Sequence, residues 1–422
     1  MKLLLSHPTA NANVRAIAMG MARENILSDF YTSTALFPSS FLYKVGGFSL
    51  LTNLRKRSFD PKLKSHIHQW PWRELGKVIA SGIGIDKLTR HEKGIFCIDK
   101  VYESLDKKVS SHLKSKNIKA VYAYEDGALH TFKAAKELGI TCIYDLPIAY
   151  WETGRKLLQE EAGRLPTWAI TLGGGIQDSE EKLERKTREL ELADVVIGPG
   201  DFVMNSLPAW AKTKKLIVSP FGSPEPPNIR VFGNKNFEKP LRILFVGSMG
   251  QRKGLGDLFT AMKMLKNENV ELVVLGSLLA PMEFYKSELP NFIYEPCRPH
   301  SEVLKLMQTC DIFCLPSIVE GRALVMQEAM SQGLPLIITP NTGGEDLIIE
   351  NETGFLIPIR RPEAIAEKIM WFVNNRSSAE EMGYKARCWA ENYTWKKYSE
   401  KIVKEILVYL GAVENNYMQE RK

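Results

Sequence analysis

The sequence predicts an α/β protein made of two Rossmann-like domains that face each other across a cleft. Three observations predict this class. At 422 residues, the chain is too long to fold around a single hydrophobic core. In both halves, short apolar runs alternate with segments of helical length and periodicity, as in parallel βαβ units. A segment rich in Pro, Asn and Gly, residues 223–240, separates the halves and has the composition of a linker.

We therefore expect four parts along the chain. A first domain occupies residues 1–222 and is followed by the linker over 223–240. A second domain occupies residues 241–394. The last segment, residues 395–422, is expected to form a helix that packs back on the first domain.

The strands expected in the first half are apolar runs that end near Gly, Pro or Asp. They are MKLLLS at the start of the chain, IKAVYAY (118–124), ITCIYDLP (140–147), ADVVIGPG (193–200) and KLIVSPFG (215–222). The segment SEEKLERKTRELELA (179–193) has the pattern of an amphipathic helix, and Ser179 is in the position of an N-cap.

The second half repeats this alternation more clearly. Its expected strands are LRILFVG (241–247), ELVVLG (271–276), NFIYEP (291–296), DIFCLP (311–316) and LPLIIT (334–339). Because these strands are almost continuously apolar, they fit a sheet that is covered by helices on both faces. After the Gly-Gly turn at 343–344 we expect a further helix to start near Glu345.

The composition indicates a globular protein, with 44% hydrophobic and 25% charged residues. No apolar run reaches the roughly 18 residues that a membrane-spanning helix requires, and MKLLLSHP fits a first strand better than a signal peptide. The cysteines are scattered and include no C-x-x-C pair; they are Cys97, Cys142, Cys297, Cys310, Cys314 and Cys388. Free thiols in a reducing compartment are the simplest interpretation, so we expect a cytoplasmic location, peripheral to the inner face of a membrane if the protein meets one.

The positive charge lies in the first half. Residues 1–222 carry 32 Lys+Arg and 24 Asp+Glu, whereas the remainder carries 24 and 25. Residues 53–75 interleave basic side chains, Arg55 and Lys62 among them, with Phe59, Trp70 and Trp72. This mixture suits a peripheral contact with an anionic membrane or a lipid-linked acceptor; nucleic-acid binding and a solvated loop are the alternatives. Because His66 and His68 have no further ligand-type residues nearby in the sequence, we expect no metal site there.

The segment GSMGQRKG (247–254) follows an expected strand and opens an expected helix. Glycines at such a turn let backbone N–H groups approach an anion, and Arg252 and Lys253 add positive charge. The segment matches neither the Walker pattern nor G-x-G-x-x-G. It is therefore either a phosphate site or an ordinary strand-to-helix turn with a solvated basic pair.

The stretch SIVEGRALVMQEAM (317–330) places Glu320 and Glu328 in an otherwise largely apolar run. Glu320 is expected in a loop at the cleft edge, near the positive end of a helix that begins at 322–324. Glu328 lies two turns further on, roughly 9 Å along the helix axis. This separation fits the two ends of an extended ligand better than an acid/base pair; the alternative for Glu328 is an exposed helix residue.

Together these motifs resemble those of family 4 retaining glycosyltransferases (glycosyl transferases group 1), which have the GT-B fold. The motifs are FVGSMGQRKGL, CDIFCLPSIVEGRALVMQEAMSQGLPLIIT and TGGEDLI with TGFLIP, within residues 241–360. Weaker matches extend into the first half and to NYTWKKYSE (392–400). The resemblance implies transfer of a hexose-like sugar from a nucleotide diphosphate sugar, a co-substrate and not a bound cofactor, with retention at the anomeric carbon.

The resemblance also implies roles for individual residues. Lys253 matches the lysine that neutralises the donor diphosphate, Glu320 the acid that faces the transferred sugar, and Glu328 the acid that binds the ribose hydroxyls. Ser248 stands where the family often has Arg, and Arg252 is the candidate to supply that charge. The turn EPCRPH (295–300) corresponds to the part that touches the nucleobase. The catalytic candidates are thus Lys253, Arg252, Glu320 and Glu328, and the donor-binding candidates are Gly247, Ser248, Gly250, Gly321, Arg322, Ala323, Leu324 and Arg298.

On the acceptor side, Glu125 and Asp126 follow an expected strand and reach the cleft if the sheet has the expected polarity. Tyr150 and Trp151 leave the next strand and either line the acceptor pocket or pack in the core. The acceptor is expected to be a carbohydrate or lipid-linked molecule, with no nucleic-acid partner. The sequence contains no Asp-x-Asp, so a metal clamp on the diphosphate is not indicated. A nucleotide-sugar epimerase, a phosphorylase of the same fold and a non-catalytic binding protein remain the alternatives.

Overall fold

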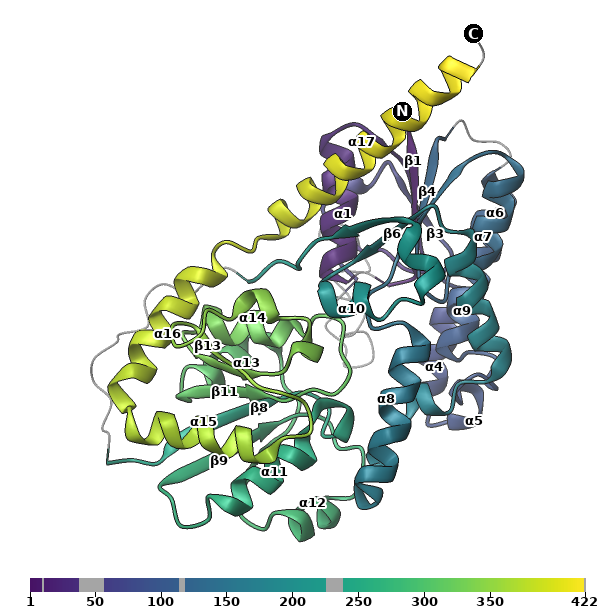
Figure 1. Ribbon diagram of the computed structural model, residues 1–422. Coiled ribbons are helices and arrows are strands. Elements are labelled where there is room, and N and C mark those ends of the chain that lie inside the picture. Colours follow the sequence, from purple (N-terminus) through teal and green to yellow (C-terminus); the bar gives the residue numbers. More distant parts are fainter. Residues whose placement is uncertain (10, 38–56, 114–117, 225–237, 421–422) are drawn as a thin grey trace.

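The computed structural model describes residues 1–9, 11–37, 57–113, 118–224 and 238–420, with side chains as far as residue 413. It contains two parallel β-sheets, one in each half of the chain, each flanked by helices (Figure 1). The predicted α/β class with two Rossmann-like domains is confirmed. Residues 53–56 of the basic segment and 225–237 of the predicted linker lie outside the described residues.

The N-terminal sheet has the strand order β3-β2-β1-β4-β5-β6-β7, and all neighbours are parallel. Its strands are β1 (Leu3–Ser6), β2 (Leu27–Thr32), β3 (Ile67–Gln69), β4 (Ala120–Tyr124), β5 (Thr141–Asp145), β6 (Val195–Gly198) and β7 (Lys215–Val218). The order reverses between β1 and β4. Ligands of such sheets bind beyond the carboxyl ends of the strands at this reversal.

Helices cover both faces of this sheet. They are α1 (Ala12–Arg23), α4 (Trp72–Gly82), α5 (Asp86–Thr89), α6 (Ile98–Leu113), α7 (Leu129–Glu137), α8 (Trp151–Arg164), α9 (Glu180–Leu192) and α10 (Asp201–Asn205), with short 3-10 turns η2 (Pro61–Leu63), η3 (Pro166–Thr171), η4 (Gly174–Ile176) and η5 (Ala209–Thr213). Alternation along the strands divides the core: Leu3 and Leu5 belong to one apolar cluster, and Leu4 belongs to the cluster on the opposite face. Ser179 caps α9 as predicted, since its Oγ accepts a hydrogen bond from the N–H of Lys182 at 3.3 Å.

The C-terminal sheet is also parallel, in the order β10-β9-β8-β11-β12-β13. Its strands are β8 (Leu241–Val246), β9 (Val270–Leu275), β10 (Ile293–Glu295), β11 (Ile312–Leu315), β12 (Leu336–Ile338) and β13 (Gly354–Leu356). Its helices are α11 (Leu255–Met264), α12 (Met282–Glu288), α13 (His300–Met307), α14 (Leu324–Ser331), α15 (Pro362–Asn374) and α16 (Arg376–Ala390), with the 3-10 turns η6 (Gln251–Lys253) and η7 (Pro340–Thr342). The prediction of a helix that starts near Glu345 is wrong. The chain makes only the 3-10 turn η8 (Glu345–Leu347) there, and the backbone at Ile348 is already extended.

The last helix, α17 (Trp395–Glu420), leaves the C-terminal domain and runs along α1 (Figure 1). Tyr398, Ile402 and Ile406 are buried in the same apolar cluster as the first strand. The chain therefore crosses from the N-terminal to the C-terminal domain and then returns. Within the described residues, no helix combines the length and apolar character needed to cross a membrane.

Candidate functional site

The glycine-rich loop at 247–254 joins β8 to α11 and holds Lys253 against the end of the strand. Gly247 has φ +152°, and a Cβ at this position would lie 2.6 Å from Cδ of Lys253. Gly254 has φ +73°, and a Cβ there would lie 2.0 Å from the carbonyl oxygen of Pro316, just beyond β11. The loop therefore lies at the carboxyl ends of β8 and β11, where the strand order of this sheet reverses.

Two cations from this loop converge on one buried carboxylate. Lys253 Nζ lies 2.5 Å and Arg252 Nη1 2.9 Å from Oε1 of Glu320, which is 8% exposed. Arg252 also donates to the carbonyl of Val319 at 3.0 Å. Burial alone raises the pKa of Glu320, but the charges and hydrogen bonds of Lys253 and Arg252 outweigh it, so the pKa falls below its ordinary value. Glu320 is therefore an ionised side chain at neutral pH and not a proton donor.

Glu328 lies two turns along α14 and is more accessible than Glu320. Its side chain is 19% exposed, and Oε1 is 3.0 Å from Nε2 of His300, the first residue of α13. The two predicted acids thus occupy different surroundings. Glu320 forms ion pairs in the interior, whereas Glu328 is partly exposed beside α13. Arg298, in the turn before α13, forms an ion pair with Glu295.

Between the two acids, the side chains of Arg322 and Leu324 and the N–H of Ala323 make contacts within the protein. The side chain of Arg322 has no exposed surface and donates to the Gly343 carbonyl at 2.8 Å and to Oδ1 of Asp346 at 2.6 Å. The N–H of Ala323 donates to the carbonyl of Thr342 at 3.2 Å. Leu324 packs against the core of the N-terminal domain. The Arg322 side chain therefore orders the loop that precedes α14 and presents no charge to solvent.

Glycines form the contact between the domains beside this loop. A Cβ on Gly321 would lie 1.7 Å from the carbonyl oxygen of Pro147 in the N-terminal domain. A Cβ on Gly343 would lie 1.8 Å from the Gly321 carbonyl oxygen, and one on Gly200 would lie 3.0 Å from the Gly343 carbonyl oxygen. The backbones of the two domains can pack directly against each other here because these residues are glycines and have no side chain.

A segment of the first half, residues 151–172, also docks on the C-terminal domain, which the sequence reasoning missed. Trp168, in η3, is 2% exposed and belongs to the core of the C-terminal domain. Its ring meets Phe259 and Phe284 edge-on at centroid distances of 5.5 and 5.0 Å, and its Nε1–H donates to Glu288 at 3.2 Å. No local pattern in the sequence distinguishes this tryptophan from one that packs in its own domain.

A buried polar network accompanies this docking. Glu161 of α8 has no exposed surface and accepts hydrogen bonds from Arg164 and from Gln251 Nε2, the latter at 2.8 Å. Arg164 binds both carboxylate oxygens of Asp257 at 2.8 Å, and Arg360 also pairs with Glu161. Gln251 belongs to the glycine-rich loop. The network therefore fixes the loop from the side of the N-terminal domain.

Glu125 and Asp126 lie just beyond β4, as expected, but both belong to an internal ion-pair cluster with α9. Glu125 is 8% exposed and lies 3.5 Å from Nζ of Lys186, while Asp126 pairs with Arg185 at 2.7 Å. Burial and the neighbouring Asp126 raise the pKa of Glu125 to about 7 against the opposing effect of Lys186. Burial also acts to raise the pKa of Asp126, but Lys186 and Arg185 lower it overall.

His7, beyond the end of β1, is a further polar residue at this edge that the sequence reasoning did not select. It is 4% exposed, and its Nδ1 accepts a hydrogen bond from the N–H of Thr9 at 2.9 Å. Burial and the nearby charge of Arg57 lower its pKa to about 4, so the ring is neutral at pH 7. Its position directly after the first strand, in LLLSHP, is the sequence signal that could have identified it.

Tyr150 lies in the core, and Trp151 is half-buried beside it. Tyr150 has no exposed surface, and its hydroxyl lies 3.1 Å from Oγ1 of Thr187 on α9. Trp151 Nε1–H donates to the same oxygen at 3.1 Å. Both rings therefore fix the start of α8 to α9.

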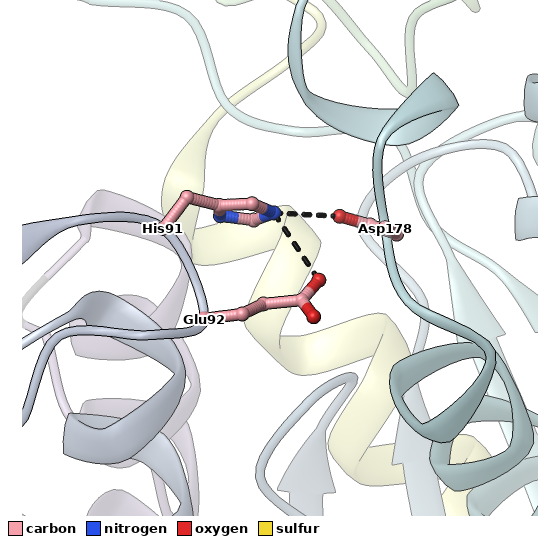
Figure 2. A group of neighbouring side chains, drawn as sticks. All are labelled: His91, Glu92 and Asp178. Carbon is pink, nitrogen blue, oxygen red and sulfur yellow. Dashed lines mark hydrogen bonds and ion pairs between the residues drawn. The ribbon is translucent and has the colours of Figure 1, made fainter.

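The group His91, Glu92 and Asp178 has the residue types of a metal site (Figure 2). Nε2 of His91 lies 3.1 Å from Asp178 Oδ1 and 3.2 Å from Glu92 Oε1. However, Lys182 Nζ lies 3.1 Å from the same oxygen of Asp178. Because an ammonium group at this distance opposes a divalent cation, we interpret the group as an ion-pair network that ties residues 91–92 to the start of α9.

The described part of the basic segment, residues 57–75, divides between core and surface. Arg57 pairs with the buried Glu74 at 2.5 Å, and Phe59 is 2% exposed. Trp70 lies under Nζ of Lys108, 4.7 Å from the ring centroid. Trp72 is 66% exposed. One aromatic residue of the predicted membrane contact is thus in the core, and another lies on the surface.

The sequence is similar to a known protein family and to several curated proteins. Residues 228–389 match the family model described as glycosyl transferases group 1. The capsular polysaccharide biosynthesis glycosyltransferase CapM of Staphylococcus aureus is 30% identical over 228 residues, which are 50% of this chain and 58% of CapM. The amylovoran biosynthesis glycosyltransferase AmsK of Erwinia amylovora is 31% identical over 144 residues, 30% of this chain and 35% of AmsK. The chain thus spans less than two thirds of these curated relatives.

Solved structures extend the similarity to the whole chain. Sucrose-phosphate synthase from Thermosynechococcus elongatus superposes with a TM-score of 0.66 at 16% identity, covering 98% of this chain and 100% of that one. Anabaena HepE in complex with UDP superposes with a TM-score of 0.59 at 13% identity, covering 97% and 100%. At these identities the likeness concerns the fold, and the fold is the GT-B arrangement that the sequence predicted.

Proposed function

We propose that this protein, whose residues 228–389 belong to the glycosyl transferases group 1 family, transfers a hexose-like sugar from a nucleotide diphosphate donor to an acceptor. The observation that carries the proposal is the convergence of Lys253 and Arg252 on Glu320 at the carboxyl edge of the C-terminal sheet. Lysine has three donors and arginine five, so both cations can bind phosphate oxygens in addition to this carboxylate.

The chemistry of transfer explains why cations are needed at this position. As the bond between the anomeric carbon and the diphosphate breaks, negative charge develops on the leaving phosphate oxygens. Lys253 and Arg252 are fixed by Glu320 before the reaction, so they stabilise that charge with little reorganisation.

The two acids act at opposite ends of the donor in this proposal. Glu328, with its accessible carboxylate, binds the ribose hydroxyls, and Glu320 faces the sugar and the cations. The depressed pKa of Glu320 argues against a general acid, so the two-carboxylate mechanism of glycosidases does not apply. We propose that transfer retains the configuration at the anomeric carbon, which NMR of the product would show directly.

We place the acceptor on the side of the N-terminal domain, near the carboxyl ends of β1 and β4. The acceptor is proposed to be a carbohydrate or a lipid-linked sugar, and the protein is proposed to work in the cytoplasm at the inner face of a membrane. Incubating the donor without acceptor tests the alternatives: conversion of the donor sugar itself identifies an epimerase, and a requirement for inorganic phosphate identifies a phosphorylase.

Replacing Glu328 with alanine is expected to weaken binding of the donor nucleotide by about 10- to 100-fold, because hydrogen bonds to a charged group are lost. Calorimetric titration with uridine, guanosine and adenosine diphosphates identifies the base on the wild-type protein and then measures the loss in the variant. Glu302→Ala, an exposed acid on α13, is the matched control and should bind as wild type. Unchanged affinity in Glu328→Ala overturns the ribose assignment.

Removing divalent cations is expected to leave the transfer rate unchanged. The proposed site counters the leaving diphosphate with Lys253 and Arg252, so it needs no metal ion for this purpose. Initial rates are compared in excess EDTA and in excess magnesium chloride. A rate that falls in EDTA and recovers with magnesium would contradict the proposed leaving-group stabilisation.

A further inference from the structure

The face of the N-terminal domain formed by α4 and α5 exposes large apolar side chains that the proposed donor site does not use. Trp72 is 66%, Ile79 60% and Ile83 64% exposed. At about 100° per residue, these three positions fall within about 40° of one another around α4. They therefore form a single apolar stripe along the outside of the helix.

Two further isoleucines near α4 in the sequence are exposed. Ile85, next to the start of α5, is 43% exposed, and Ile95, before α6, is 53% exposed. A Cβ on Gly76, on the same side of α4, would lie 2.3 Å from the ring of Phe96, so this ring lies beside the stripe. In Figure 1, α5 lies at the lower edge of the N-terminal domain, below α4.

Basic side chains lie on α4 itself and along the chain that follows it. Residues 72–108 contain eight Lys and Arg, none of them buried, and six Asp and Glu, of which Glu74, Asp99 and Asp106 are buried. Among the side chains of residues 72–108 that are not buried, basic residues therefore outnumber acidic ones by eight to three. The basic residues are Arg73, Lys77, Lys87, Arg90, Lys93, Lys100, Lys107 and Lys108.

A basic cavity adjoins the helix. It has a volume of about 420 Å³ and is lined by Trp70, Arg73, Lys100, Glu103, Ser104, Lys107 and Lys108. Arg73 belongs to both features, since it projects from α4 and lines the cavity. Glu103 is the one acid of the lining, and it pairs with Lys100 at 2.7 Å and Lys107 at 2.6 Å. The lining retains a net positive charge after this pairing.

We propose that this face, defined by the apolar stripe of α4 and the basic side chains of residues 73–108, docks on an anionic lipid bilayer. Tryptophan and isoleucine enter the headgroup region, and the Lys and Arg side chains bind lipid phosphates, with the cavity beside Arg73 receiving one headgroup. The combination of an apolar stripe with these basic side chains distinguishes a lipid surface from a protein interface, whose core is poor in lysine. Docking requires neither donor nor acceptor, so it can be tested independently of the proposed transfer.

The experiment is flotation of the full chain with vesicles of phosphatidylcholine and with an equimolar mixture of phosphatidylcholine and phosphatidylglycerol. The protein is expected to float with the anionic vesicles and not with the zwitterionic ones, and added salt should weaken binding. The double variant Ile79→Ser, Ile83→Ser is expected to reduce binding by about tenfold or more. Val408→Ser on α17, an exposed apolar residue (63%) outside this face, is the matched control.

A second variant tests the contribution of the basic side chains to vesicle binding separately from that of the apolar side chains. Lys77→Glu combined with Lys87→Glu leaves the apolar stripe intact and should also lower binding to anionic vesicles by about tenfold. Thermal unfolding of each variant verifies the fold. Equal flotation of the wild type and the Ile79→Ser, Ile83→Ser variant overturns the proposal. The proposal is also overturned if the wild-type protein does not bind vesicles but forms a dimer that the Ile79→Ser, Ile83→Ser variant does not form. That result would identify the face as a protein interface.

Discussion

Replacing Lys253 with alanine is expected to lower the turnover number for sugar transfer by about 100- to 1000-fold. Lys253 Nζ is held 2.5 Å from Glu320 and beside Gly247, so the ammonium is oriented before the donor arrives. Its proposed interaction strengthens as the diphosphate leaves. A group that acts mainly in the transition state lowers kcat more than it raises KM when removed, and initial rates over a range of donor concentrations measure this division.

The control for this variant is Lys263→Ala, on the exposed side of α11, whose ammonium lies 3.5 Å from Glu288. It should retain wild-type kinetics. Lys253→Met preserves the aliphatic stem that covers Gly247, and it should lose as much activity as Lys253→Ala because the charge is the functional part. Wild-type turnover in either Lys253 variant is incompatible with the proposed role.

Replacing Trp168 with alanine is expected to destabilise the C-terminal domain by about 3–5 kcal/mol, the usual cost of removing a buried aromatic ring. At roughly 2–4 °C per kcal/mol, the melting temperature falls by about 6–20 °C. The reason is that Trp168, although it belongs to the first half of the chain, fills space between Phe259, Phe284 and Tyr285. Differential scanning calorimetry measures the shift.

Trp210→Ala is the comparison for this experiment, because Trp210 is 44% exposed and should tolerate the change with little loss of stability. Limited proteolysis adds a local measurement: in Trp168→Ala, cleavage within residues 165–178 is expected to accelerate. If the melting temperature of Trp168→Ala equals that of the wild type, the segment around Trp168 contacts the surface of the C-terminal domain without contributing to the stability of its core.

The parts of the fold that could be predicted from the sequence are those with a local signal. Buried parallel strands are continuously apolar, so the central strands of both sheets are evident as runs such as LRILFV and AVYAY. Two neighbouring strands of the N-terminal sheet were missed. β2 was missed because Ser28 and Asp29 interrupt its apolar run, and β3 because it is a three-residue edge strand with two exposed polar residues. The helix expected near Glu345 does not form because consecutive Leu347, Ile348 and Ile349 give no helical periodicity, and the chain turns again at Asn351, with φ +63°.

In the candidate site, too, the sequence predicted the local motifs but not the contacts between them. Lys253, Arg252 and Glu320 were predicted as separate motifs, and the structure brings them together because β8 and β11 are neighbours in the sheet. The motif did not indicate that Arg322 is buried against Asp346, since the spacing of residues does not reveal which way a side chain points. The docking of Trp168 across the domain boundary has no local signal, because a tertiary contact between distant segments leaves none in either one.

The glycines at 200, 321 and 343 let the two domains lie as close together as the structure has them. A Cβ would clash at Gly321, 1.7 Å from the Pro147 carbonyl oxygen, and at Gly343, 1.8 Å from the Gly321 carbonyl oxygen, and it would be tight at Gly200, 3.0 Å from the Gly343 carbonyl oxygen. A single alanine at Gly321 would therefore act as a spacer and push the two domains apart here, even though alanine adds no charge. The relative position of the two domains is thus sensitive at this point to the smallest possible change in side-chain volume.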